Sequence, residues 1–450
     1  MNHGENRQTA VISPARPASG GPDAAPILGR GLICLLGIAC AAGVGNVYLA
    51  QAVSPLIASG LHVAASSAGL VVTVTQFGYT AGMFLLVPLS DRCAHRRLIV
   101  TLLALAGLGL LAAAAAPALP VLIGATAFVG VTTVVAPVIA PMAAGLTPAD
   151  RRGTVSGALL SGSIGGMLLS RVFGGMLAEH LGWRAPYLAS AAVTAVLAVI
   201  LARALPSTSP SPAGRYPALL AETVRLLRTQ PGLRRSTYYQ AMVFAGFSAV
   251  WTEVAFLLTG PRYQMSTTAV GMLALVNAAT MVCTPVAGRR VDRHGPDAVN
   301  LVCLPAVIVA AALCALGGRG GTTGIIALVA GTLLLDVAMQ SGMVANQVRI
   351  YALGTQTAGR ANTAYMTGAY LAGGIGSWLG TRVYLLSGWT GVCALVALLA
   401  ALALARHLTP ARTAAAAAEG ARRRRPRRAS GRHSRQTSQI GTTRTARPGG

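Results

Sequence analysis

Long apolar segments separated by short polar ones dominate the chain between residues 31 and 406. A membrane-spanning helix needs roughly 20 mainly apolar residues, because it must cross the hydrocarbon core of the bilayer. Segments of this kind cover approximately residues 31–53, 66–88, 98–117, 120–145, 154–179, 185–204, 236–258, 267–288, 298–317, 322–348, 361–384 and 388–406. The pattern predicts an all-α membrane protein with twelve transmembrane helices.

A polar segment in the middle of the chain divides the twelve predicted spans into two groups of six. We therefore expect a six-helix bundle over residues 31–204, a cytoplasmic linker over 205–235 and a second six-helix bundle over 236–406. Residues 1–30 are polar and lead directly into an apolar run without a cleavage site, which predicts a disordered cytoplasmic tail rather than a cleaved signal peptide. Residues 407–450 form an arginine-rich tail, also expected in the cytoplasm.

The two predicted halves repeat one another. An Asp-Arg pair follows both the second and the eighth span, at Asp91-Arg92 and Asp292-Arg293. A Gly-Trp pair follows both the fifth and the eleventh span, at a similar offset. Such internal repeats are how many secondary transporters are built, and they predict two pseudo-symmetric halves.

Composition agrees with a membrane protein. About 54% of the residues are hydrophobic, 10% are charged and the mean hydropathy is +0.60, whereas soluble chains carry about 25% charged residues. The formal net charge is +25, and all 36 basic residues are arginine. Without lysine the chain cannot contain a P-loop, which excludes ATP-driven pumping by this chain alone.

The distribution of arginine predicts the orientation, because cytoplasmic loops collect positive charge. With the N-terminus placed inside, the outer loops hold only Arg184, Arg262 and Arg319, with Arg382 near an outer helix end, and the inner loops hold many more. We expect a multi-pass protein of the plasma membrane with both termini in the cytoplasm.

The sequence contains no motif that indicates cofactor binding or catalysis. The seven cysteines form no C-x-x-C pair, so neither a disulfide framework nor a zinc site is indicated. The predicted loops are short and contain no nucleophile–base pair, metal cluster or cofactor motif. We therefore expect no cofactor, no bound metal and no enzymatic activity.

The segment that joins the second and third spans resembles the signature of the major facilitator superfamily, G-x-L-x-D-R-x-G-R-R. The matching residues are Leu89, Asp91, Arg92, Arg96 and Arg97, whereas Val87 and Ala94 replace the two glycines. A second copy with both glycines runs from Gly288 to Gly295. Over residues 30–405 the chain is similar to bacterial drug:proton antiporters and sugar-efflux-like permeases of this superfamily.

The resemblance implies a gating role for both copies, through Asp91, Arg92, Arg96, Arg97, Asp292 and Arg293. An aspartate beside arginines at a cytoplasmic helix end can form charge-assisted hydrogen bonds. In the family this cluster is thought to hold the outward-open form. The alternative is that Asp91 only neutralises a basic loop.

Glycines are dense in two of the predicted spans. Gly157, Gly165 and Gly166 of the fifth span resemble the antiporter signature G-x-x-x-G-P-x-x-G-G, in which Ser161 and Gly162 replace the central G-P. The eleventh span contains Gly373 and Gly374. Small residues let helices pack closely in lipid, so these glycines are candidates either for packing alone or for a role in export.

Only two of the eleven acids, Glu253 and Asp336, fall well inside predicted spans. An ionisable group in hydrocarbon is costly and usually faces a cavity or a partner. In the resembled fold the first, fourth, seventh and tenth helices line the central cavity, which places both acids on cavity helices. We predict that one of them carries the coupled proton. Asp336 is favoured because it lies near mid-span, and the alternative is a structural ion pair or a neutral, hydrogen-bonded acid.

Further polar residues within the spans are candidates for contact with a substrate. These are Asn46, Gln51, Gln76, Gln340 and Arg171. For Gln76 and Gln340 the alternative is an interhelical hydrogen bond. Arg171 needs a partner or must extend towards the interface, and it could bind an anionic group.

Residues 411–450 contain eleven arginines and a single acid, Glu419. No aromatic residue lies among them, so base stacking is not indicated and no specific nucleic-acid partner is expected. A solvated tail that contacts anionic lipids is the favoured interpretation.

The leading hypothesis is a secondary active transporter, a monomer in the lipid bilayer, that exports a small molecule in exchange for protons by alternating access. The first alternative is an uptake symporter or facilitator on the same fold. A membrane receptor or tether without transport activity is less favoured.

Overall fold

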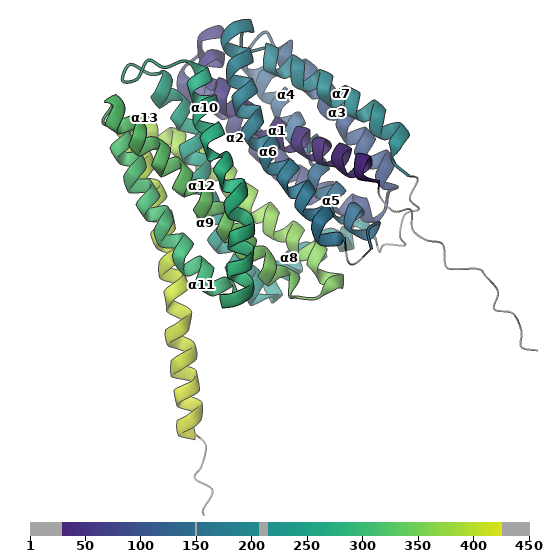
Figure 1. Cartoon of the computed structure of the whole chain (residues 1–450), viewed down its shortest axis with the longest axis vertical. Helices are drawn as coiled ribbons and strands as arrows, with labels where there is room; N and C mark the ends of the chain where they lie inside the picture. The colour runs from purple at the N-terminus through teal and green to yellow at the C-terminus, as the bar shows by residue number, and fades with distance from the viewer. Residues whose placement is uncertain (1–28, 149–150, 207–214, 425–450) are drawn as a thin grey trace, which may run out of the picture. The chain divides into compact units, whose positions relative to one another are not determined.

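The computed structural model of the chain describes residues 29–148, 151–206 and 215–424, and these residues form helices and short connections without a strand (Figure 1). In chain order the helices are α1 (Arg30–Gly60), α2 (Ala65–Leu85), the 3-10 turn η1 (Pro88–Asp91), α3 (His95–Ala114), α4 (Leu119–Thr132), α5 (Val135–Gly145), α6 (Arg152–Leu181), α7 (Ala185–Ala204), α8 (Tyr216–Thr229), α9 (Pro231–Thr259), α10 (Thr267–Val276), the 3-10 turn η2 (Asn277–Ala279), α11 (Thr280–Gly317), α12 (Gly321–Tyr351) and α13 (Thr355–Arg424). The prediction of an all-α fold is confirmed. Of the predicted tails over 1–30 and 407–450, residues 1–28 and 425–450 lie outside the described residues, whereas residues 407–424 continue helix α13 rather than forming a disordered segment.

Within the described residues, ten helices are long and apolar enough to cross a membrane. Three of the predicted spans account for the difference from twelve, one because it is broken and two because they are merged. The eighth is broken by η2, so that Thr267–Ala279 falls short of a full span. The last two run together in α13, which passes through the non-helical backbone of Gly388. The exact number of crossings stays a prediction.

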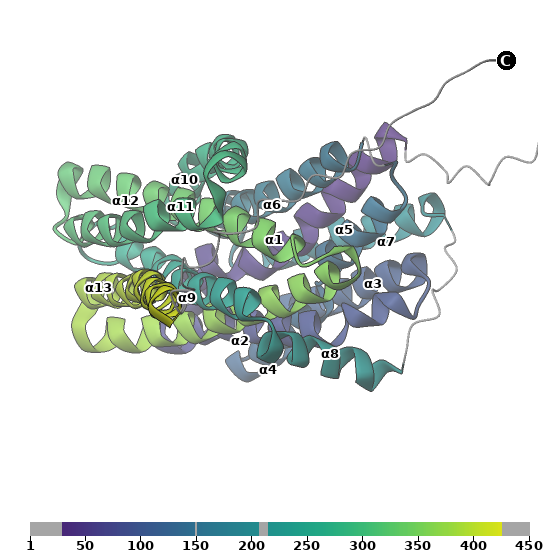
Figure 2. The same cartoon turned by 90° about the horizontal axis from the view of Figure 1, so that it is seen from below.

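The chain divides into two compact units, Met1–Leu404 and Ala405–Gly450. Within the first unit, α1, α3, α5, α6 and α7 gather on one side, and α9, α11 and α12 on the other (Figures 1 and 2). We call α1–α7 the N-terminal half, and α9 to residue 404 the C-terminal half. Inside these halves α1 packs against α6, α3 against α7, and α11 against α12.

The linker predicted over residues 205–235 contains a helix that the sequence pattern did not reveal. Helix α8 is amphipathic, with Leu219 and Leu226 buried and charged side chains on its other face. The Tyr216 hydroxyl at its start donates a hydrogen bond to the Leu85 carbonyl oxygen at 2.6 Å. This short helix is therefore tied to the end of α2 as well as to α9.

The repeated Gly-Trp pairs have a backbone explanation. Gly182 ends α6 with φ +85°, and Gly388 breaks α13 with φ +63°. Left-handed backbone of this kind favours glycine, because it has no Cβ. The tryptophans that follow are both buried, and Trp389 donates its indole N–H to the Cys314 carbonyl oxygen at 2.6 Å. Each pair therefore makes a sharp turn that is anchored by a buried indole.

Close backbone contact joins α6 to α1. A Cβ added at Gly162 would collide with the Gly37 carbonyl, and one added at Gly166 would collide with Ala41. Gly376 of α13 stands in the same relation to Ala245 of α9. Gly157 and Gly165 meet no atom within 4 Å, so they take no part in this packing.

Gly373 and Gly374 of α13 approach the Phe244 and Phe77 rings instead, at 2.6 and 2.9 Å from the added Cβ. Of the six glycines singled out in the sequence, four therefore lie against another helix.

Replacing Gly166 with alanine is expected to destabilise the protein by about 1–3 kcal/mol, because the added methyl group forces α6 away from the α1 backbone. The matched variant Gly165→Ala meets open space and is expected to be neutral or to stabilise by up to about 1 kcal/mol, since alanine favours the helix. The midpoint of thermal unfolding of the purified variants checks this. Equal midpoints for the two variants would contradict the packing assignment.

Candidate functional site

One of the arginines that lie within a predicted span is fully buried. Arg171 of α6 is 0% exposed. Its Nε and Nη2 atoms donate hydrogen bonds of 3.0 and 2.7 Å to Oε1 of Gln51 on α1. The side chain therefore does not extend towards solvent, and its hydrogen-bond partner is a neutral amide rather than a carboxylate.

Aromatic rings surround the guanidinium. Its Cζ atom lies 3.9 Å from the centre of the Trp251 ring, 5.1 Å from that of Tyr48 and 5.7 Å from that of Phe247. A cation over an aromatic face is attracted by about 2 kcal/mol or more when both are shielded from water. These contacts help to keep a charge in an apolar environment.

Trp251 connects this cation to a buried acid. Its indole N–H donates a 3.0 Å hydrogen bond to Oδ1 of Asp336 on α12, which is 1% exposed. Oδ2 of Asp336 accepts a second hydrogen bond, of 3.1 Å, from Nδ2 of Asn277. Both carboxylate oxygens therefore accept hydrogen bonds. The Arg171 guanidinium, which has the opposite charge, lies over the ring face of the same tryptophan.

We call Gln51, Arg171, Trp251, Asn277 and Asp336 the Arg171–Asp336 cluster. The first two residues belong to the N-terminal half and the other three to the C-terminal half. The formal charges of the ionised cluster sum to zero, because it holds one guanidinium and one carboxylate. An unpaired charge at this depth would cost several kcal/mol, so each charge stabilises the other.

Asn277 owes its position to a break in the helix. It starts the 3-10 turn η2 between α10 and α11, and the Thr280 hydroxyl donates to its carbonyl oxygen at 2.7 Å. Breaks of this kind near the middle of a span are common at substrate sites, because they release backbone and side-chain groups towards a cavity.

Three polar atoms of the cluster are buried and have no hydrogen-bond partner among the described residues. They are Nη1 of Arg171, Nε2 of Gln51 and Oδ1 of Asn277. Buried polar groups in proteins are nearly always hydrogen-bonded to protein or ordered water. These three atoms therefore have hydrogen-bonding capacity that the described residues do not use.

Three further candidate residues within the spans, Asn46, Gln340 and Gln76, do not form part of the cluster. Asn46 of α1 donates a 3.4 Å hydrogen bond to Thr133 between α4 and α5. Gln340 follows Asp336 by one turn of α12, and its Oε1 has no described partner. Gln76 of α2 is fully buried, and neither atom of its amide has a described partner.

Glu253, the second buried acid, belongs to a different contact. Its Oε1 accepts a 2.6 Å hydrogen bond from Thr381 of α13. Beside it Ser377 bonds both Thr73 of α2, at 2.9 Å, and Thr252 of α9, at 3.0 Å. We call Thr73, Thr252 and Ser377 the hydroxyl network, and it joins the two halves at the end that the arginine distribution predicts to face outside.

A second contact between the halves lies at the same end. Thr267 of α10 donates to the Gly175 carbonyl oxygen of α6 at 3.1 Å, and the backbone N–H of Thr268 donates to Oε2 of Glu179 at 3.0 Å. Gly175 and Gly271 allow this approach, because an added Cβ at either would lie 3 Å or less from the other helix. The predicted outer ends of the two halves are therefore closed on one another.

The gating residues at the opposite end do not form the predicted cluster. Asp91 and Asp292 are both exposed, and neither makes an ion pair within the described parts of the chain. Arg92, Arg97 and Arg293 are exposed as well, and Arg96 is partly buried. Asp297 is the acid that is paired here, with Arg235 at 3.1 Å and with Arg349. The gating cluster, which the family resemblance links to the outward-open form, is therefore not formed in this conformation. The predicted outer end is closed in the same conformation.

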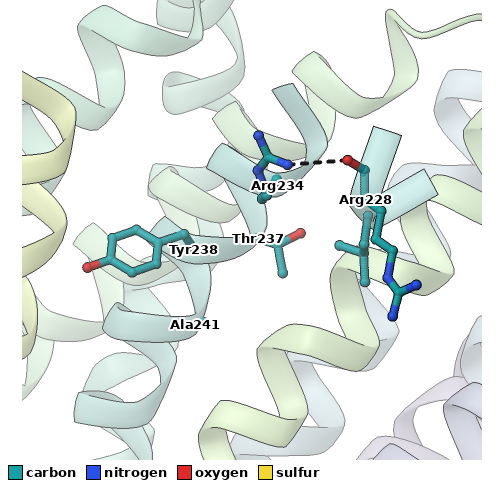
Figure 3. A pocket seen from close by; sticks show the side chains of 6 residues that line it. Arg228, Arg234, Thr237, Tyr238 and Ala241 are labelled. Atoms are coloured by element: carbon teal, nitrogen blue, oxygen red, sulfur yellow. Dashed lines mark hydrogen bonds between the residues drawn. The ribbon is translucent and has the colours of Figure 1, made fainter. Parts of the chain in front are cut away.

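An open pocket of about 390 Å³ lies between α8 and α9, away from the cluster. Figure 3 shows Arg234 donating to the backbone oxygen of Arg228, at 3.2 Å, while the Arg228 guanidinium and the Tyr238 ring point in different directions. The charged groups of this pocket do not converge on a common point. The Arg171–Asp336 cluster is therefore the stronger candidate for the functional site.

Sequence reasoning missed Trp251 and Asn277. Phe244, Phe247 and Trp251 recur on α9 with the spacing of one helical face, which is a usable signal. Asn277 is the one amide in an apolar run over 267–288 and could have been singled out for the same reason as Gln340. That both would contact Asp336 could not be deduced without the fold.

The comparisons with known proteins agree with these observations. The family model described as Major Facilitator Superfamily matches residues 34–353. The chain is 35% identical to the uncharacterized transporter YgaY of Escherichia coli O157:H7, over 81% of this chain and 92% of that protein. It is 34% identical to the "Probable transporter SCO4007" of Streptomyces coelicolor, over 84% and 86% of the two chains.

Solved structures show the same fold. A bacterial homologue of the human lysosomal transporter Spinster, crystallised in an inward-facing and unoccupied conformation, matches with a TM-score of 0.65 and 16% identity, over 85% of this chain and 97% of that one. The nucleoside transporter NupG matches with a TM-score of 0.67 and 12% identity, over 84% and 99%.

Proposed function

The chain belongs to the major facilitator superfamily, and we propose that it is a secondary transporter that exports a small molecule in exchange for protons. Its relatives are named as transporters. The export direction and the coupling to protons are our proposal. The observation that carries it is the Arg171–Asp336 cluster, in which a buried carboxylate lies where the two halves meet.

In this mechanism Asp336 binds and releases the proton. Its carboxylate is shielded from water and balanced by Arg171 across the Trp251 ring. A proton changes the charge of the cluster and therefore the contact between the halves. Alternating access would expose this same group first to one side of the membrane and then to the other.

In this cycle the described conformation has its predicted outer end closed, and both Asp336 and Arg171 are buried in it. The hydroxyl network and the α6–α10 contact close the predicted outer end. Neither Asp91 nor Asp292 forms an ion pair with an arginine among the described residues, so the predicted inner latch is not formed there. The outward-facing state would form the latch and separate Ser377 from Thr73.

Export is tested in cells that express the chain and are exposed to a panel of toxic compounds and metabolites. We expect reduced accumulation of at least one compound, and loss of this reduction when a protonophore collapses the pH gradient. Transport in right-side-out and inverted vesicles then separates export from uptake symport. Undiminished export without a pH gradient would contradict proton coupling.

A disulfide across the hydroxyl network tests alternating access. The Thr73 and Ser377 hydroxyl oxygens lie 2.9 Å apart, and sulfurs in their place are close enough to form a bond. Oxidation of the Thr73→Cys/Ser377→Cys double variant is expected to stop transport, and reduction to restore it. The single variant Thr73→Cys is the control, and unchanged transport by the cross-linked protein would exclude this contact as a gate.

A further inference from the structure

Two amides of the Arg171–Asp336 cluster have orientations that are fixed by charged partners. Gln51 accepts two hydrogen bonds from the Arg171 guanidinium, so the atom that it turns towards Arg171 must be Oε1. Asn277 donates to the Asp336 carboxylate, so the atom that it turns towards Asp336 must be Nδ2. The free atom is therefore the amide nitrogen of Gln51 and the amide oxygen of Asn277.

The free atoms of the cluster are consequently of opposite polarity in the two halves. Among the described residues, Nη1 of Arg171 and Nε2 of Gln51 are donors without an acceptor on the N-terminal side, and Oδ1 of Asn277 is an acceptor without a donor on the C-terminal side. A ligand that satisfies both sides has an acceptor group at one end and a donor group at the other. Bound in this way it bridges the halves across the Trp251 ring.

The charge balance restricts the ligand further. With Asp336 ionised, the cluster has no net charge, and a ligand with a net charge would remain uncompensated at full burial. The other titratable groups that face the pair are Cys314 of α11, beside Asp336, and Tyr48 of α1, beside Arg171. Neither adds a second carboxylate or cation. The cluster therefore fits a molecule without net charge, such as a zwitterion.

A proton on Asp336 changes the free atom of Asn277. At Oδ1 a protonated carboxyl group would find no acceptor in Trp251, because the indole is a donor only. At Oδ2 it forms an O–H group that needs an acceptor, and the Asn277 amide supplies one by turning Oδ1 towards it. Its Nδ2 then becomes the free atom, and the site presents a donor where it presented an acceptor.

We propose that Asn277 converts protonation of Asp336 into a reversal of hydrogen-bond polarity at the substrate site, so that a net-neutral molecule with a donor group binds more weakly when Asp336 is protonated. This inference rests on the proposed proton-coupled export. It makes the proton and the substrate each weaken binding of the other, as exchange requires. The proton passes from water to the Asp336 carboxylate and back, and no other bond is formed or broken.

Binding of three matched probes to the purified full-length chain in detergent tests the substrate class. L-Phenylalanine carries both an ammonium and a carboxylate group, phenylpropionate lacks the donor, and phenethylamine lacks the acceptor. At neutral pH we expect only phenylalanine to raise the unfolding midpoint. Binding of either truncated probe with equal affinity, or of none of the three, would overturn the substrate class.

The pH dependence of phenylalanine binding tests the role of Asn277. In the wild type we expect an apparent Kd about tenfold higher at acidic than at neutral pH, the change associated with one buried hydrogen bond. Asn277→Ala should remove this difference, because the variant has no amide to turn. Asn300→Ala should keep it, since Asn300 is equally buried but bonds Pro296 and Asn346.

The variant Asp336→Asn separates this inference from the proposed function. Its amide imitates the protonated acid, so phenylalanine should bind weakly at both pH values. If Asp336→Asn abolishes the pH dependence and Asn277→Ala retains it, the amide reversal is wrong and the proton site stands. If Asp336→Asn retains the wild-type pH dependence, both the amide reversal at Asn277 and the proton site at Asp336 are wrong.

Discussion

Replacing Asp336 with asparagine is expected to abolish export driven by a pH gradient in proteoliposomes, reducing it to the level of vesicles without protein. Asparagine keeps the shape of the side chain and can still bond Trp251 and Asn277, but it cannot exchange a proton. The variant therefore removes the coupling chemistry with little change in packing.

Glu253→Gln is the matched control for this prediction. Glu253 is as deeply buried as Asp336, and it accepts a hydrogen bond from Thr381 that a glutamine oxygen can also accept. We expect this variant to retain most of the proton-coupled transport. Gel filtration of both variants confirms their fold. Full coupling in Asp336→Asn, or its loss in Glu253→Gln alone, would transfer the proton site from α12 to α9.

Replacing Arg171 with methionine is expected to destabilise the protein by about 3–5 kcal/mol, because it leaves the buried Asp336 carboxylate without its opposite charge. The double variant Arg171→Met/Asp336→Asn should recover most of this loss, since neither charge remains. Thermal unfolding of the two variants and of Asp336→Asn forms a double-mutant cycle that isolates the interaction between the two residues.

Arg382→Met provides the control for the loss of an arginine as such. Arg382 also lies over a tryptophan, with its Cζ 5.8 Å from the Trp378 ring centre, but it is exposed. Exposed contacts of this kind contribute little, so a change within about 0.5 kcal/mol is expected. A double variant that is less stable than Arg171→Met would show that Arg171 and Asp336 do not stabilise one another.

The fold could be predicted from the sequence because the lipid bilayer allows the backbone only a few kinds of secondary structure. Each backbone group must be bonded within its own helix, so long apolar runs become helices wherever they occur. The number of crossings was harder to predict. The run over 267–288 is interrupted by a 3-10 turn at Asn277, and hydrophobicity alone does not reveal such a break.

The candidate site was predicted in part. The scarcity of charge in the spans singled out Arg171 and Asp336, since each is costly in hydrocarbon and needs compensation. The sequence could not show that a tryptophan lies between them. Trp251 is 85 positions from Asp336 along the chain, and its contact depends on how α9, α6 and α12 pack. Glu253 satisfied the same sequence criterion but lies among hydroxyl groups at the predicted outer end.

The order of contacts in the Arg171–Asp336 cluster bears on how the halves move. Its hydrogen bonds are internal to one half, from Arg171 to Gln51 and from Trp251 and Asn277 to Asp336. The contact that crosses between the halves is the guanidinium on the face of Trp251. Hydrogen bonds weaken steeply when they are bent, whereas a flat cation can slide and tilt over a ring with little loss. At this cluster one half can therefore rotate on the other without breaking any of the cluster's own hydrogen bonds.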